Sequence, residues 1–209
     1  MPKIIKFIAL FLLLPCSVFA NKNSDKSLFY KHQAELVELE KYLNSITSFN
    51  ADFTQTLEND TTNGKFFLSR NNKTAGKMRI EYNGKPKILV VVNGSILSYH
   101  DLELDEISRI STNTTPASLL TRPNISFLAS DITISNVVSN NQQLEVTIIK
   151  KNRPDLGQFT LKFAKNPWQF LQMQVKNDLE QIITISLSNI KFENNPNHLF
   201  IIKNNEDNS

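Results

Sequence analysis

The chain has 209 residues, of which 23 are Lys or Arg, 20 are Asp or Glu, and 40% are hydrophobic. This length fits one domain with a core large enough to be stable without disulfides. The formal charge of +3 falls to about +1 if Lys3 and Lys6 are removed with a leader. That balance excludes the clustered positive charge on which nucleic-acid binding and polybasic membrane docking depend.

Residues 1–20 have the pattern of a secretory signal peptide. The basic start MPKIIK precedes the apolar run FIALFLLL, and Val18 and Ala20 occupy the −3 and −1 positions of a cleavage site. The run is shorter than the ~20 residues of a membrane-spanning helix. We therefore predict that residues 1–20 are cleaved and that residues 21–209 form a single exported domain.

The only cysteine, Cys16, lies in this leader. A lipid-anchored protein would need a small residue before that cysteine, and Pro15 occupies the position, so lipidation is not expected. The mature chain would then contain no cysteine, whereas secreted eukaryotic domains more often carry disulfides. The pattern favours the bacterial periplasm.

Residues 24–46 are expected to form an amphipathic helix. Ser24 or Asp25 can cap its start, and apolar residues then recur at helical spacing on one face. That face consists of Leu36, Leu39, Leu43 and Ile46. The same pattern suits a helix that covers a sheet and an ordinary packed surface helix.

From residue 49 the apolar residues alternate with the two-residue period of β-strands. Asn93-Gly94 between ILVVV and SILSY predicts a tight hairpin turn, and Asn177-Asp178 predicts another. The expected strands are 49–57, 65–70, 77–82, 87–92, 95–99, 131–138, 143–150, 158–164, 170–176 and 181–192, with a last strand-like run, HLFIIK, at 198–203. Short antiparallel strands at this spacing indicate a barrel or a strongly curved sheet.

Residues 114–130 interrupt the β pattern. Thr115 is a candidate N-cap, Pro116 suits the first position of a helix, and Pro123 divides the segment into two expected helical turns. The apolar residues of these turns are Leu119, Leu120, Phe127 and Leu128. Such a segment fits a lid over the sheet and, equally, a connector packed on the core.

The sequence contains no motif of a catalytic or metal-binding site. His32, His100 and His198 have no metal-ligand spacing, the glycines form no phosphate-binding loop, and no GxSxG elbow occurs. The acidic residues between positions 101 and 106 suit a solvated strand and loop better than a calcium loop. We therefore predict a protein that is not an enzyme and has no cofactor, metal or catalytic residue; a small hydrolase is a minor alternative.

Five segments between residues 46 and 120 resemble the bacterial periplasmic outer-membrane lipoprotein carrier family, LolA. ITSFNADFTQT resembles the family's motif after its N-terminal helix, and the other four, in order, are GKFFLSR, KMRIEY, Pro86 with ILVVVNGSILSYHDLELDEIS, and TTPASLL. The last eighty or so residues match only as repeated strands. The family implies a mainly β (α+β) fold: an incomplete, strongly curved antiparallel β-barrel of about eleven strands, with an N-terminal helix and a short helical lid around an apolar cavity.

The resemblance also implies an activity. Members of the family take acylated lipoproteins from an inner-membrane ABC transporter, shield the acyl chains in the periplasm and deliver them to the outer membrane, where an acceptor can receive them. We expect this chain to act in that way as a monomer that binds no nucleic acid. The alternative is a periplasmic lipoprotein-sensing or regulatory domain of the same fold, although such proteins usually carry an extra domain.

Site residues follow from the same resemblance. In the family an arginine at the end of one strand latches the lid, and Arg70 stands at that position, followed by Asn71 instead of the usual proline; Arg79 is the fallback. From the residues alone, an arginine before a polar turn is usually solvated. The implied lid residues are Pro116, Leu119, Leu120 and Phe127. The candidate cavity residues are Phe53, Phe66, Leu68, Met78, Ile80, Leu36, Leu39 and Leu43.

Overall fold

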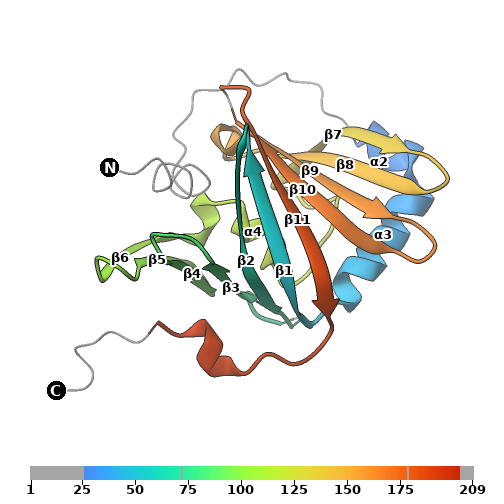
Figure 1. Ribbon diagram of the computed structural model, residues 1–209. Helices are drawn as coiled ribbons and strands as arrows, with labels where there is room; N and C mark the ends of the chain where they lie inside the picture. The colour runs from blue at the N-terminus through green and yellow to red at the C-terminus, as the bar shows by residue number, and fades with distance from the viewer. Residues whose placement is uncertain (1–25, 72, 178, 203–209) are drawn as a thin grey trace.

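One sheet of eleven antiparallel strands dominates the computed structural model, which describes residues 26–71, 73–177 and 179–202 (Figure 1). The strand order is β6-β5-β4-β3-β2-β1-β11-β10-β9-β8-β7, so that β6 and β7 are the two edges of an open, strongly bent sheet. This arrangement confirms the predicted mainly β class and the incomplete, curved barrel. The predicted export signal, residues 1–20, lies outside the described residues.

The sheet consists of two meanders. The first contains β1 (Ser48–Leu57), β2 (Asp60–Ser69), β3 (Lys77–Tyr82), β4 (Ile88–Asn93), β5 (Ile96–Asp101) and β6 (Glu106–Ser111). The second contains β7 (Ile132–Ser139), β8 (Gln143–Lys150), β9 (Gln158–Ala164), β10 (Gln169–Lys176) and β11 (Ile182–Lys191). The pairing of β1 with β11 joins the two halves in the middle of the sheet.

The connection between the two meanders has to cross the sheet, because β6 and β7 lie at its opposite edges. It contains the 3-10 turn η1 (Thr112–Thr114) and the short helix α4 (Ala117–Leu120), and it runs behind β1 and β2 in Figure 1. Its buried residues Ala117 and Phe127 belong to the same core as the inward side chains of the strands. The segment therefore covers the inner face of the bent sheet.

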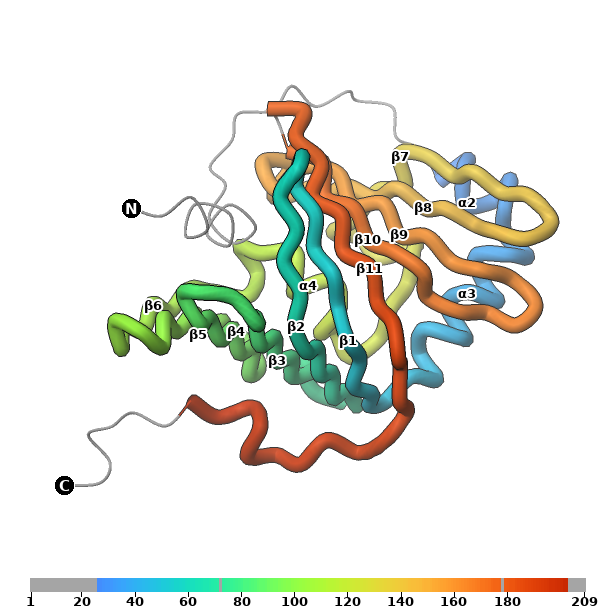
Figure 2. The backbone as a smooth tube through the Cα atoms, in the orientation of Figure 1, coloured from blue at the N-terminus to red at the C-terminus, as the bar shows by residue number. Residues whose placement is uncertain are grey.

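Two helices cover the inner face of the other half. Helices α2 (Ser27–Lys31) and α3 (Gln33–Ser45) lie beside β7–β10 (Figures 1 and 2). The helix that the sequence predicts over 24–46 is interrupted at His32, whose φ of −115° departs from helical geometry. The predicted caps Ser24 and Asp25 lie outside the described residues, and the helix boundary falls at Lys26, which forms no side-chain capping bond.

The connection between the two meanders, residues 112–131, which we call the crossing segment, differs locally from the prediction. Helix α4 begins one residue later than expected, and the Thr115 hydroxyl donates to the carbonyl of Thr112 at 2.9 Å instead of capping α4. The second helical turn expected after Pro123 is wrong, because residues 121–131 form bends and turns in the structure. Helices this short have little stability of their own, so contacts with the rest of the fold hold the segment in place.

The predicted hairpin turns are found, one with a shifted register. Strand β4 extends through Asn93, which pairs with Ile96, so the turn residues are Gly94 and Ser95. Gly94 has φ +64°, which glycine adopts without strain, and a positive φ at the first turn position is the pattern of a type II′ turn. The turn predicted at Asn177-Asp178 is found at Asn177, whose side-chain oxygen accepts from the backbone N–H of Gln181 at 2.9 Å, whereas Asp178 lies outside the described residues.

The predicted elements differ from the structure at two further places: strand β6 is not among the expected strands, and the expected C-terminal strand is wrong. The edge strand β6 is exposed or half-buried along its whole length, so it lacks the alternation by which the others were identified. The run HLFIIK was expected to be a strand, but its start forms the 3-10 turn η3 (Asn197–Phe200). Phe200 there packs with Leu89 and Val91 on the outer face of the sheet. The C-terminal segment as a whole lies below β1–β4 in Figure 2.

Candidate functional site

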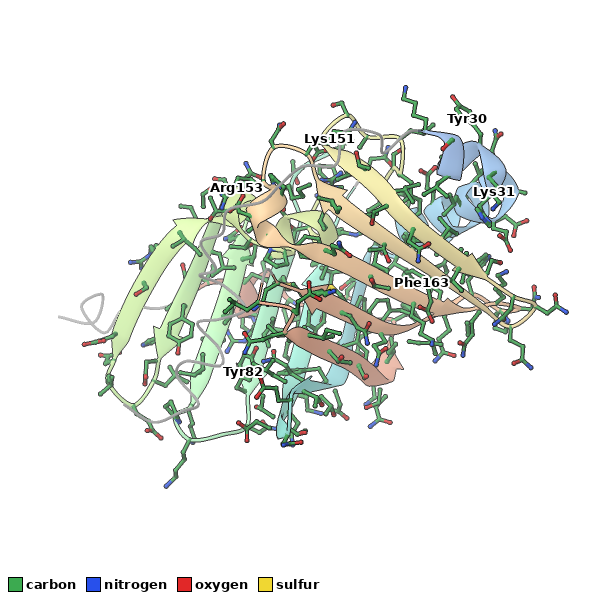
Figure 3. All side chains as sticks on the ribbon, turned by 90° about the horizontal axis from the view of Figure 1, so that it is seen from above. Tyr30, Lys31, Tyr82, Lys151, Arg153 and Phe163 are labelled. Carbon is green, nitrogen blue, oxygen red and sulfur yellow. The ribbon has the colours of Figure 1, made fainter. Side chains whose placement is uncertain are left out.

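An apolar cavity of about 80 Å³ lies between the inner face of the sheet, the end of α3 and the crossing segment. The strands β1, β2, β3, β10 and β11 form its floor, and Ala117, Leu120 and Ile125 of the crossing segment close it. Figure 3 shows the side chains of the two halves of the sheet, with Tyr82 in one and Phe163 in the other. Nearly all of the lining is hydrocarbon, so the cavity suits an apolar ligand.

Most of the cavity residues that the sequence pointed to meet at this place. The lining contains Phe53, Phe66, Leu68, Met78, Ile80 and Leu43. They converge because inward positions repeat every second residue along each strand, and the register places Phe66 opposite Ile80 and Leu68 opposite Met78. Leu36 and Leu39 are fully buried in the neighbouring core, where α3 packs on the sheet.

The four lid residues have different positions. Leu120 lines the cavity, whereas Leu119 and Phe127 are buried in the core, and Pro116 is the N-cap residue of α4. The backbone N–H of Gly76 in the β2–β3 loop donates to the carbonyl of Thr121 at 2.6 Å and fixes the end of α4.

Sequence reasoning missed part of the lining. Phe170, Met173, Ile185 and Leu187 come from β10 and β11. They reach the cavity because β11 pairs with β1, which places Leu187 directly opposite Phe53. Their alternation predicts that they face inward, but the long-range pairing of β1 with β11 is needed to place them here.

Arg70 lies at the cavity wall, directly after β2. Its Nη2 donates to the carbonyl oxygen of Ile46 at 2.9 Å and also to that of Leu43. These carbonyls belong to the end of α3, where a helix leaves its last carbonyls without intrahelical partners and attracts positive charge. Arg70 is only 9% exposed, and burial lowers its pKa, although a guanidinium remains charged. The side chain of Arg70 therefore binds the C-terminal end of α3 and its C-cap residue Ile46, and forms no hydrogen bond with residues 116–127.

Helix α3 is in turn bonded to the crossing segment. The side-chain amide of Asn44 both donates to the carbonyl of Ile125 and accepts from its N–H, each at 2.8 Å. The carboxylate of Glu40 accepts from the N–H of Phe127 at 2.5 Å. Arg70, α3 and residues 125–127 thus form one hydrogen-bonded chain over the cavity, which we call the cover.

A second basic residue holds α4 from the far side. Lys150 on β8 donates to the Ser118 hydroxyl at 2.9 Å and to the Asn113 carbonyl at 3.3 Å. It is 7% exposed, and burial lowers its pKa. An ion pair between Arg122 and Asp131, with an N–O distance of 2.8 Å, joins the residues after α4 to the end of the crossing segment.

Arg79, the alternative latch, points away from the cover. Its Nη1 donates to the carbonyl of Leu199 at 2.8 Å, and its Nε lies 2.5 Å from the Glu81 carboxylate. Leu199 belongs to the segment on the outer face of the sheet. The side chain of Arg79 therefore binds the C-terminal segment and is separated from the cavity by the sheet.

The titratable groups around the cavity give it little reactive chemistry. Burial raises the pKa of Tyr82 well above its usual value of 10, so its phenol is neutral at physiological pH. Within residues 26–71, 73–177 and 179–202, no three His, Cys, Asp or Glu side chains come close enough to hold a metal ion.

Among the described helices, none has the length and hydrophobicity needed to cross a bilayer.

Similarity to known proteins extends over most of the chain. An uncharacterised protein of Rickettsia prowazekii (strain Madrid E) is 24% identical over 180 residues, which cover 85% of this chain and 81% of the relative. Two crystal structures share the fold. A domain from Vibrio parahaemolyticus, described as a putative outer membrane lipoprotein-sorting protein, matches with a TM-score of 0.52 at 10% identity over 83% of this chain and 96% of its own. A conserved protein from Thermus thermophilus matches with a TM-score of 0.50 at 8% identity, over 80% of this chain and 91% of its own.

The family match covers most of the described fold. The model of the outer membrane lipoprotein carrier protein LolA aligns with residues 44–203, from the end of α3 through all eleven strands to the C-terminal segment. It therefore includes the second meander, which in the sequence resembles the family only as repeated strands. This chain belongs to the LolA family of outer membrane lipoprotein carrier proteins.

Proposed function

We propose that this protein is a periplasmic carrier that binds the acyl chains of lipoproteins released from the inner membrane and takes them to the outer membrane. The observation that carries the proposal is the apolar cavity beneath a hydrogen-bonded cover in a member of the carrier family. Burial of acyl chains contributes about 0.8 kcal/mol per CH₂. Binding of this kind needs apolar surface and no catalytic group, so the proposal assigns no enzymatic activity.

In this proposal the described conformation is the closed one, which the small size of its cavity supports. About 80 Å³ compares with the roughly 10–15 Å³ that one water needs on the same measure. Long acyl chains need far more space than this. Loading therefore requires the cover to move away from the sheet, and the crossing segment is suited to this because its helix has only four residues.

Arg70 acts in this proposal as a latch on α3. The closed cover and the acyl chains compete for the same space between sheet and helix, so each hydrogen bond that stabilises the closed form promotes release. Because α3 is bonded to residues 125–127 through Asn44 and Glu40, the hydrogen bonds of Arg70 to α3 also stabilise the closed position of the crossing segment. We thus propose that Arg70 acts on the crossing segment indirectly, through α3.

A carrier of this kind needs partners at both membranes. At about 0.8 kcal/mol per CH₂, acyl chains do not leave a membrane for water at a useful rate. We propose that the inner-membrane lipoprotein-releasing ABC transporter loads the protein and that it delivers its cargo as a monomer, to an acceptor at the outer membrane or to the membrane itself. The signal-peptide pattern of residues 1–20 supports export to the periplasm.

The test uses a tripalmitoylated cysteinyl peptide and the same peptide without acyl chains, each incubated with the mature protein and analysed by size-exclusion chromatography and mass spectrometry. We expect a stable complex with the acylated peptide alone. Leu187→Glu places a charge in the cavity lining and should weaken binding at least tenfold, since an unpaired charge beside apolar acyl chains is costly.

The matched control is Ile182→Glu in the same strand, where the side chain is 45% exposed. It introduces the same charge outside the lining and should bind like the wild type. Equal retention of the acylated and unacylated peptides by the wild type would contradict the proposed function. Equal loss of binding in both variants would show that the charge acts on β11 as a whole and not on the cavity.

A further inference from the structure

One polar side chain stands out in the apolar cavity. Gln55 occupies an inward position of β1, between Phe53 and Leu57, and it is fully buried. Its side chain contributes to the cavity lining. Its Oε1 accepts a hydrogen bond from the Tyr82 hydroxyl at 3.0 Å. Its Nε2, in contrast, forms no hydrogen bond with any group of the described residues.

The contact with Tyr82 fixes which end of the amide is free. Tyr82 is buried on the neighbouring half of the cavity floor and keeps its proton, because burial disfavours its charged form and raises its pKa. Its hydroxyl therefore donates to Oε1, and the two N–H groups of Nε2 remain. Rotating the amide by 180° would leave the hydroxyl proton and Oε1 without partners instead, which improves nothing.

A buried amide without a partner is unusual in a folded protein, because buried donors are nearly always satisfied. A leucine of similar size would fill the same position without this cost. The same cavity is proposed above to receive acyl chains, and each acyl chain carries one polar atom that only accepts hydrogen bonds, its carbonyl oxygen. A neutral amide donor at an apolar wall matches a neutral carbonyl acceptor.

We propose that Gln55 is a recognition site for the acyl carbonyl: its Nε2 donates a hydrogen bond to the carbonyl oxygen of an ester- or amide-linked acyl group bound in the cavity. This inference rests on the proposed function and adds to it a preference for acyl chains over plain alkyl chains. Tyr82 is a positioning residue, which holds the amide with its donor end toward the ligand. Arg70, whose Nε is also unpartnered among the described residues, is already committed to α3.

The experiment compares three ligands with the same sixteen-carbon chain and closely similar polar heads. Glycerol monopalmitate has an ester carbonyl, N-palmitoylserinol has an amide carbonyl, and 1-O-hexadecylglycerol has an ether without a carbonyl. Dissociation constants for the mature protein are measured by displacement of a fluorescent fatty acid. We expect the wild type to bind at least one acyl compound about 5- to 30-fold more tightly than the ether; the tighter of the two identifies the linkage.

Two variants test the role of the side chain. Gln55→Leu should bind all three ligands equally. If the unpaired Tyr82 hydroxyl makes this variant unstable, Gln55→Leu/Tyr82→Phe removes both hydrogen-bonding partners, and it should also bind the three ligands equally. Gln174→Leu, on β10, changes an amide that bonds to Thr184 outside the lining and should keep the preference. Thermal unfolding confirms that each variant is folded.

The outcomes separate this inference from the proposed function. Equal affinity of the wild type for ester, amide and ether would overturn the recognition site while leaving an apolar carrier intact. A preference that persists in the double variant would overturn it as well. If the wild type binds none of the three ligands, the carbonyl site and the carrier function both fail.

Discussion

The guanidinium of Arg70, directly after β2, donates a hydrogen bond of 2.9 Å to the carbonyl oxygen of Ile46, directly after α3. This bond joins the rim of the sheet to the end of the helix that covers it. No carboxylate shares the site among the described residues, and the helix carbonyls are the groups that bind the charge. The latch therefore depends on the position of α3, and movement of α3 away from Arg70 breaks it.

Arg70→Leu should favour the open form and slow the release of cargo. Hydrogen bonds to a charged, buried group contribute about 1.5–3 kcal/mol, so their loss should raise apparent affinity for the tripalmitoylated peptide about 10- to 100-fold. Arg70→Lys should restore release poorly, because an ammonium group lacks the planar fork of donors. Separate loading and release assays measure both steps.

Arg79→Leu is the control for this prediction, because Arg79 binds the C-terminal segment on the other face of the sheet. It should load and release like the wild type. A release defect in Arg79→Leu with normal release by Arg70→Leu would transfer the latch role to Arg79. Normal release by both variants would mean that the cover closes without an arginine.

Asn44→Ala should increase local opening of the crossing segment without unfolding the sheet. It removes both hydrogen bonds between α3 and Ile125, each worth about 0.5–1.5 kcal/mol. Backbone amide exchange at residues 121–127 should become about 10- to 100-fold faster. Hydrogen exchange with mass spectrometry measures this directly. Asn83→Ala, which removes an exposed amide contact with Asn63, should leave these residues unchanged; unaltered protection in Asn44→Ala would show that other contacts hold the lid.

Glu35→Gln should destabilise the protein in a pH-dependent way. Burial opposes the ionisation of Glu35, but hydrogen bonds from Lys165 and Ser139 outweigh it and lower its pKa below the usual 4.5. A carboxyl whose pKa is lowered by folding contributes stability above its unfolded pKa and loses it as the pH falls through the folded value. We expect a loss of about 1 kcal/mol at pH 7 that disappears progressively below about pH 4.5.

Urea unfolding of wild type and Glu35→Gln from pH 3 to pH 8 measures this difference. Glu38→Gln, an exposed carboxylate on the same helix, serves as the control and should change the free energy of unfolding little at any pH. A loss in Glu35→Gln that is the same at pH 3 and pH 7 would show that shape, and not charge, makes Glu35 stabilising.

Gly64→Ala should destabilise the floor of the cavity by about 2–3 kcal/mol. A Cβ at this position would lie 1.8 Å from the carbonyl oxygen of Glu81 and 2.7 Å from the ring of Phe53. Gly84→Ala is the matched control, because a Cβ there meets nothing within 4 Å, and its effect should stay within about 0.5 kcal/mol. Chemical denaturation measures both; a Gly64→Ala variant as stable as the wild type would mean that β2 and β3 separate easily.

Local pattern in the sequence was sufficient to predict most of the strands, and with the family resemblance it gave part of the cavity lining. The candidates Phe53, Phe66 and Met78 do line the cavity, because side chains alternate along a strand and hairpins place neighbouring strands side by side. The same reasoning failed for β6, where an edge position removes the alternation, and for the run at 198–203, where apolar residues cover the outer face of the sheet.

Only the tertiary structure decided what lies across the cavity. The pairing of β1 with β11 joins residues more than a hundred positions apart, and it brings Leu187 to Phe53. It also places β6 and β7 at opposite edges, which makes residues 112–131 cross the inner face. Sequence resemblance singled out Arg70, but its partners are backbone carbonyls, which carry no sequence signal. Gln55 gave no signal either, because a single polar residue at an inward position acquires meaning only from the apolar walls that surround it.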